Sequence, residues 1–202
     1  MKKQHFIMLI LLISTIELLV FVFSKSITSN AAVYWQLAAR YSARITFYIL
    51  CIILFWTGIK GLKNIYANEK TRILLINLFA LLAINHLIHF YFIYKNFEIN
   101  NYEWFKAKHI AGSIVYPILV ITPLYLGKQK IINKKKYWLI YTSLLPTFIV
   151  FTVSYIGRLT NDLVYKSPNI LFFIHLTLIT IMLILNIRSI YLELKHSNII
   201  NE

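Results

Sequence analysis

The stretch ILLINLFALLAINHLIHFYFIY, residues 73–94, contains no Lys, Arg, Asp or Glu. About 20 mostly apolar residues are enough to cross a bilayer as a helix. The whole chain of 202 residues is 59% hydrophobic and only 14% charged, too little polar surface to cover a soluble core. The sequence therefore predicts an all-α integral membrane protein, a bundle of six transmembrane helices that forms one domain over residues 1–202. The predicted spans are 6–23, 42–60, 73–94, 109–126, 138–155 and 169–190.

The net charge of +14 comes from short basic runs between the apolar segments. These runs form no basic, aromatic-studded face, so the composition points to the lipid bilayer and not to nucleic acid as the partner. If the N-terminus is inside, most Lys and Arg residues fall in the inner segments, and Lys134–Lys136 is the densest group. The positive-inside rule then predicts an inner (cytoplasmic) membrane protein with both termini in the cytoplasm.

The N-terminal segment has two interpretations. Lys2 and Lys3 precede an apolar run, as in a secretory signal peptide, but the run is long and contains Glu17. We expect an uncleaved first helix. Cys51 is the sole cysteine, which excludes an intramolecular disulfide and a cysteine metal site.

Four of the six histidines are predicted near the outer side of the membrane. At 1.5 Å per residue from Arg72, His86 lies about 21 Å and His89 about 25 Å along the third span. The fourth span begins outside at His109, and His175 lies about 10 Å inside the sixth. Neutral imidazoles in a helical bundle suit haem iron or another transition metal. The alternative is that they only form hydrogen bonds to Asn85, to Ser or Thr, or to the backbone.

Charged residues on the same helices add two candidate features. Arg40 and Arg44, one turn apart, and Arg158 are predicted on the outer side, where guanidinium groups could bind haem propionates or simply extend to the interface. Glu17 lies about 17 Å into its helix, near the bilayer centre. A carboxyl group there marks a proton path, the partner of a buried base, or a protonated acid hydrogen-bonded across helices.

Several motifs are absent from the sequence. There is no glycine-rich phosphate loop, no GxGxxG after a strand and no His-Glu-x-x-His. The longest connections, 24–44 and 95–108, are too short for a nucleotide-binding domain. Electrons for any redox reaction would have to come from a quinone or a protein partner.

Several local sequences together resemble one family. They are Ala38 to Arg44 (AARYSAR), Arg72 with Leu82 to His89, Gly112 with Tyr116, Trp138, and Ser154 to Arg158 (SYIGR). In this combination the chain, over residues 36 to 190, resembles the bacterial ferric-reductase-like six-helix transmembrane domain family, which includes the haem-binding membrane subunit of the periplasmic methionine sulfoxide reductase system.

The resemblance implies a b-type haem and electron flow toward an extracytoplasmic acceptor. It implies that a histidine late in the third helix, His86 or else His89, binds the iron, and that a quinone or a reductase partner supplies electrons to be passed to a periplasmic redox protein. The family's other ligand lies in the fifth helix, where this chain has no histidine. His175 on the sixth helix could replace it.

A second function from a different class stays open. The chain could have kept the fold without the cofactor and act as a haem-free assembly partner or small permease. That function predicts sensitivity at Glu17 and around Pro117 and Pro123 in the fourth span, and tolerance of His86→Ala.

Overall fold

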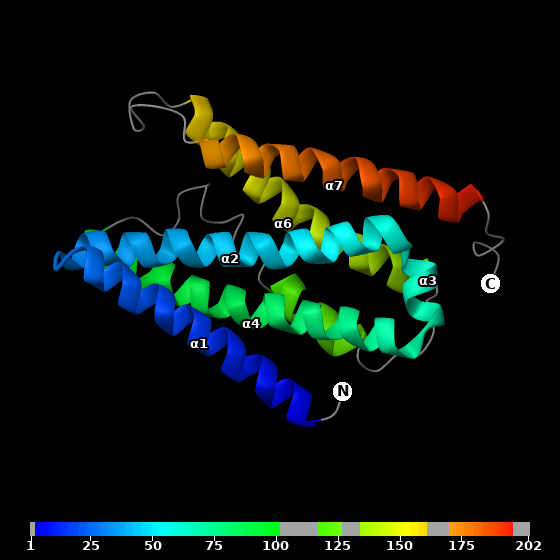
Figure 1. The fold of residues 1–202 in the computed structure, drawn as a ribbon, viewed down its shortest axis with the longest axis horizontal. Coiled ribbons are helices and arrows are strands. Elements are labelled where there is room, and N and C mark those ends of the chain that lie inside the picture. Colours follow the sequence, from blue (N-terminus) through cyan, green and yellow to red (C-terminus); the bar gives the residue numbers. More distant parts are fainter. Residues whose placement is uncertain (1–2, 102–116, 127–133, 161–169, 196–202) are drawn as a thin grey trace. The chain divides into compact units, whose positions relative to one another are not determined.

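The computed structural model describes residues 3–101, 117–126, 134–160 and 170–195, and all of its regular elements are helices (Figure 1). The helices are α1 (Lys3–Ile27), α2 (Ala31–Lys60), α3 (Leu62–Ala67), α4 (Glu69–Asn100), α6 (Lys134–Thr160) and α7 (Ile170–Lys195). A further helix covers Pro117–Leu126. Within the described ranges no strand occurs, which confirms the all-α prediction for these residues.

Four of these helices are long and apolar enough to cross a membrane: Ile7–Ile27, Ala31–Lys60, Glu69–Asn100 and Ile170–Lys195. Large apolar side chains point outward along them, as Met8 and Leu11 do on α1 and Phe173 and Ile184 do on α7. An apolar exterior of this kind suits contact with lipid. The fourth and fifth predicted spans are represented by shorter apolar helices, Pro117–Leu126 and Tyr137–Val153, so a bundle of six spans stays a prediction.

The second helix starts well before the predicted span. Most of the segment 24–44, expected as a connection, is helical, because α1 and α2 are separated only by Thr28–Asn30. Asn30 begins α2: its carbonyl accepts hydrogen bonds from the amides of Val33 (3.1 Å) and Tyr34 (3.0 Å). Hydropathy marks only the apolar part of a helix, and a helix of 30 residues, about 45 Å long, extends beyond the hydrocarbon layer.

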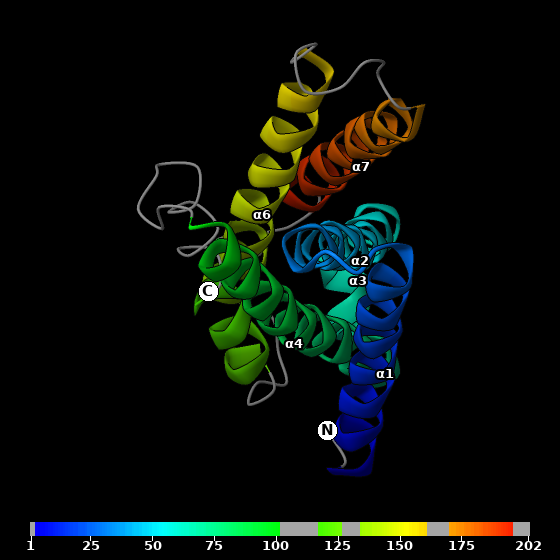
Figure 2. The same cartoon turned by 90° about the vertical axis from the view of Figure 1, so that its left-hand side faces the viewer.

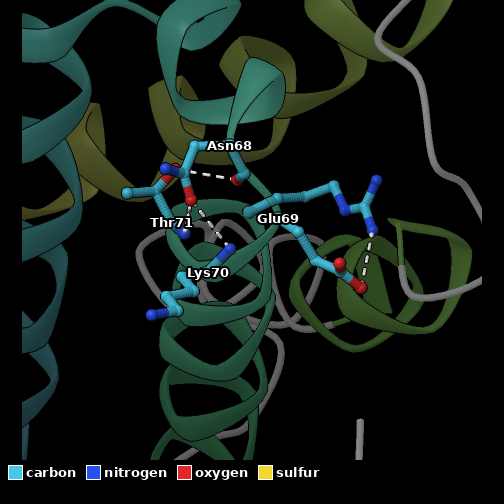
Figure 3. Close-up of polar contacts among 5 residues, drawn as sticks. Asn68, Glu69, Lys70 and Thr71 are labelled. Carbon is cyan, nitrogen blue, oxygen red and sulfur yellow. Dashed lines mark hydrogen bonds and ion pairs between the residues drawn. The ribbon is translucent and has the colours of Figure 1, made fainter.

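Helices α1, α4, α6 and α7 also extend past their predicted spans, and α4 shows how one of them begins. The Asn68 side chain accepts hydrogen bonds from the amides of Lys70 (2.9 Å) and Thr71 (3.4 Å), as Figure 3 shows. The Thr71 hydroxyl donates back to the Asn68 carbonyl (2.9 Å), and Arg72 pairs with Glu69 at 3.8 Å. This cap stops α3 and starts α4 within two residues.

The described residues fall into two compact units, one within Met1–Ile49 and Ile73–Lys128, the other within Leu50–Arg72 and Gln129–Glu202. In the first unit, α1 and the first part of α2 form a hairpin (Figure 1). Ala38 and Ala39 are buried against Phe92 of α4, and Phe21 of α1 packs on Trp35 with ring centroids 4.9 Å apart. The two alanines let α2 approach its neighbours closely, as small residues do in membrane helices.

In the second unit, α6 and α7 contact each other, and α7 also binds the last part of α2 (Figure 2). Asn186 of α7 donates to the carbonyls of Leu54 (2.7 Å) and Met182 (2.8 Å) and accepts from the Thr57 hydroxyl (2.9 Å). Gly58 lies where the helices are closest: a Cβ there would be 2.8 Å from Cβ of Leu185. Hydrogen bonds and a small residue thus hold α2 against α7.

Gly61 separates α2 from α3. Its φ of +74° disfavours other residues, and a Cβ there would lie 2.5 Å from Oε1 of Glu193. That oxygen accepts a hydrogen bond from the amide of Lys63 at 2.8 Å, which caps the start of α3 from α7. The end of α7 therefore fixes the turn that reverses the chain between α2 and α4.

Candidate functional site

A cluster of four polar side chains lies inside the first unit: Glu17 of α1, Ser42 and Thr46 of α2, and Asn85 of α4. We call it the Glu17 cluster. Glu17 is 1% exposed, and the other three are fully buried. Ser42 and Thr46 are one helical turn apart, so both face the same neighbours. Three helices therefore meet at one buried carboxyl group.

The hydrogen bonds of the Glu17 cluster converge on one carboxyl oxygen. Oε1 of Glu17 accepts from the Ser42 hydroxyl (2.9 Å) and, in a short hydrogen bond, from Nδ2 of Asn85. The Thr46 hydroxyl donates to Oδ1 of Asn85 (2.7 Å) and is also 3.2 Å from the Ser42 carbonyl. Oε2 of Glu17 is buried and has no hydrogen-bond partner among the described residues.

These contacts distinguish between the interpretations of Glu17. None of the ion pairs found in the described ranges includes Glu17, so its partners there are neutral groups and not a base. An isolated carboxylate in an apolar interior is very costly, and the neutral acid is the favoured state. Hydrogen bonds from α2 and α4 to this carboxyl group are those expected of a protonated acid bonded across helices, which stays a prediction. A proton path stays a prediction.

His86 and His89 lie on α4 next to this cluster. Both are half-buried, and their ring centroids are 5.7 Å apart. His89 is four residues after Asn85, so the two share one face of the helix. A hydrogen bond with the backbone of Ala39 holds the His89 ring, while its Nδ1 is buried with no hydrogen-bond partner among the described residues. A histidine that ligates a metal is held in this way, by a hydrogen bond at its other nitrogen.

The structure describes only some of the remaining predicted site residues. Arg40 and Arg44 are partly exposed on α2, about 200° around the helix from Ser42, and the Arg44 guanidinium lies 5.2 Å from the centroid of the Tyr41 ring. They therefore face away from the Glu17 cluster. His109 and the Arg158 side chain lie outside the described residues.

His175 is 1% exposed on α7, in line with the buried Phe172 and Ile179. It belongs to the second compact unit, and His86 and His89 belong to the first. The pairing of His86 with His175 at one iron therefore stays a prediction. Among the described residues no group of three or more His, Cys, Asp or Glu side chains could hold a metal ion. A haem, whose four nitrogens already bind the iron, needs at most two protein ligands.

The partners of Glu17 and the contact between α2 and α7 are not predicted from the sequence. Ser42 stands out there only within the AARYSAR motif, Asn85 only as a neighbour of the histidines, and Thr46 and Asn186 not at all. Their spacing could have indicated these contacts, because polar residues inside apolar spans form hydrogen bonds with one another across helices. Ser42 and Thr46 are spaced i, i+4, and Asn186 precedes Ser189 by three residues.

Three kinds of comparison with known proteins were negative. No family model, no curated protein and no solved structure matches the chain. The functional argument therefore rests on the residues and their geometry.

Proposed function

We propose that this protein is a membrane-embedded b-type haem electron-transfer protein of ferric-reductase-like type. The observation that carries the proposal is His89 of α4, whose ring is fixed by the Ala39 backbone and whose Nδ1 is buried without a hydrogen-bond partner among the described residues. An unpaired buried nitrogen costs stability unless something binds it. A haem iron supplies a partner, and it supplies one-electron redox chemistry when bound.

The two histidines of α4 can give this haem only one axial ligand. They lie one turn apart on the same helix, a rise of about 5 Å, and a porphyrin ring cannot lie between adjacent turns. The second ligand must come from another element, and buried His175 of α7 is our candidate. The sequence resemblance ranks His86 first as the ligand on α4, and the Ala39 contact together with the unpaired Nδ1 makes His89 the alternative.

The other parts of the proposal follow from the sequence. Arg40, Arg44 and Arg158 would bind carboxylate groups such as haem propionates. The protein would lie in the inner membrane with both termini in the cytoplasm, take electrons from a quinone or a reductase partner, and pass them to a periplasmic redox protein or ferric iron.

The test is a reduced-minus-oxidised visible spectrum of the detergent-purified protein, expressed with ample haem supply, with a pyridine haemochrome assay of haem per chain. We expect a b-type spectrum at about one haem per chain. His89→Ala and His175→Ala should each abolish the low-spin signal. The control His5→Ala, near the start of α1, should leave the signal unchanged. A full spectrum in both His86→Ala and His89→Ala would refute a ligand on α4.

The second candidate is a haem-free assembly partner or small permease. The Glu17 cluster favours it, because hydrogen bonds among buried side chains join α1, α2 and α4 without a cofactor. A colourless, well-folded protein that tolerates His86→Ala and His89→Ala but loses function with Glu17→Gln would support this candidate over the first.

A further inference from the structure

The two oxygens of the Glu17 carboxyl group have opposite surroundings. Oε1 accepts hydrogen bonds from Ser42 and Asn85, whereas Oε2 is buried and has no partner among the described residues. A carboxyl group with a purely structural role would be expected to place its acidic hydrogen on an acceptor, because an unpaired buried donor is costly. Here the donors are directed to one oxygen and the acidic hydrogen is left without an acceptor.

This arrangement accommodates both protonation states. The neutral acid is favoured by burial, and no charged side chain of the described residues forms an ion pair with Glu17. The carboxylate, once formed, already has two donors aimed at Oε1, and hydrogen bonds to a charged acceptor are stronger than those to a neutral one. The site therefore need not rearrange when the proton leaves.

Three helices, α1, α2 and α4, contribute the charged and titratable groups near Glu17. On α4, His89 shares the face of Asn85, and His86 is the next residue. On α2, Arg40 and Arg44 face away. On α1 the nearest charged residue in sequence is Lys25, about 12 Å along the helix.

We propose that the Glu17 cluster is a reversible proton-binding site, in which Oε2 of Glu17 releases its proton and takes it back. The acid becomes a carboxylate and the proton passes to water in the aqueous phase. The proposal does not depend on haem, because none of the four cluster residues is a haem ligand candidate.

A monovalent cation is the competing ligand, because the cluster is rich in oxygen. The hydrogen-bond pattern argues against it. A cation would need oxygen lone pairs directed at a common point, but hydrogens of Ser42 and Asn85 occupy the space beside Oε1. Thr46 and Asn85 have their oxygens directed at each other, 2.7 Å apart. The geometry therefore favours a proton.

Infrared spectroscopy of the full-length protein in detergent tests the proposal. We expect the carbonyl stretch of a protonated carboxylic acid at neutral pH, absent in Glu17→Gln and retained in Glu98→Gln, a control at an exposed ion pair with Lys95. The band should decline reversibly as the pH is raised. Ser42→Ala and Asn85→Leu each remove one donor to Oε1, so each should raise proton affinity roughly tenfold to hundredfold and move the decline to higher pH.

The same experiment can overturn the proposal in three ways. The absence of the band in the wild type would mean that Glu17 is ionised. A band that stays constant over the whole pH range in which the protein remains folded would make the carboxyl group purely structural. Displacement of the band by Na⁺ at constant pH would identify a cation site. If Glu17→Gln fails to fold, carbodiimide labelling of the wild-type protein can replace the variant, with the labelled residue identified by mass spectrometry. The absence of an adduct at Glu17 would refute the proposal.

Discussion

The contact of Asn186 with α2 offers the sharpest test of how the helices of the second unit are held together. Asn186 makes three hydrogen bonds, and only the one with the Thr57 hydroxyl joins two side chains across helices. Hydrogen bonds between membrane helices contribute about 0.6 kcal/mol each on average, with a maximum near 1.7. Asn186→Leu removes two such interhelical bonds, to Thr57 and to the Leu54 carbonyl, and should lower the free energy of unfolding by roughly 1 kcal/mol.

A double-mutant cycle isolates the bond between Thr57 and Asn186. Thr57→Val alone should cost about 0.6 kcal/mol, and in the Asn186→Leu background it should cost almost nothing, because the partner is already absent. Unfolding would be followed by far-UV circular dichroism during titration of mixed micelles with a denaturing detergent. Thr177→Val is the control, since Thr177 is exposed and its hydroxyl bonds only within α7. Strict additivity of the two substitutions would refute the interhelical bond.

Substitutions at four further positions test the turn region and the helix contact. Gly58→Ala should destabilise the protein by about 1–3 kcal/mol despite the better helix propensity of alanine, since the new methyl group meets Leu185; an unchanged unfolding midpoint would contradict the close approach. Gly61→Ala should cost about 1–2 kcal/mol through its positive φ, and proteolysis of the turn should increase; a wild-type cleavage rate would argue against strain there. Asn68→Ala should cost about 1 kcal/mol by removing the cap of α4, whereas Asn68→Asp, which keeps the acceptor, should cost little; equal losses would rule out the cap. Burial raises the pKa of Tyr66 to about 12, against a usual 10.0, although the Arg72 charge lowers it. The folded state therefore holds this proton more tightly, so stability is full below about pH 10 and falls as the pH rises toward 12, and an equally steep loss in Tyr66→Phe would exclude Tyr66 as the cause.

The positions of the main helices could be predicted from the apolar runs in the sequence. Residues 73–94 contain no charge, and a helix covers them in full. The helix ends were less accessible, because hydropathy reports the buried or lipid-facing part of a helix and not its hydrogen-bonded length. Thus α2 begins at Ala31 and not near residue 42, since Asn30 caps a segment of ordinary helix formers that is not apolar enough to score as a span.

The candidate site was readable only as separate parts. The sequence singled out Glu17 for its cost in a membrane, and His86 and His89 for their spacing on one helix face. It did not show that Ser42 and Asn85 would direct their hydrogens to the same oxygen of Glu17, because these residues are 25 and 68 positions away along the chain. Such pairings depend on which helix packs beside which, and no local pattern specifies this.

The sequence by itself determined an all-helical chain with apolar exteriors, because every backbone polar group in a bilayer must be satisfied within its own segment. It also singled out Glu17, His86 and His89 as polar residues within apolar spans. The tertiary structure alone decided their partners: Glu17 with Ser42 and Asn85, Thr57 with Asn186, and Glu193 with the amide of Lys63. The physical reason is that hydrophobicity does not distinguish one helix face from another in lipid, so close packing at small residues and a few directional hydrogen bonds set the arrangement.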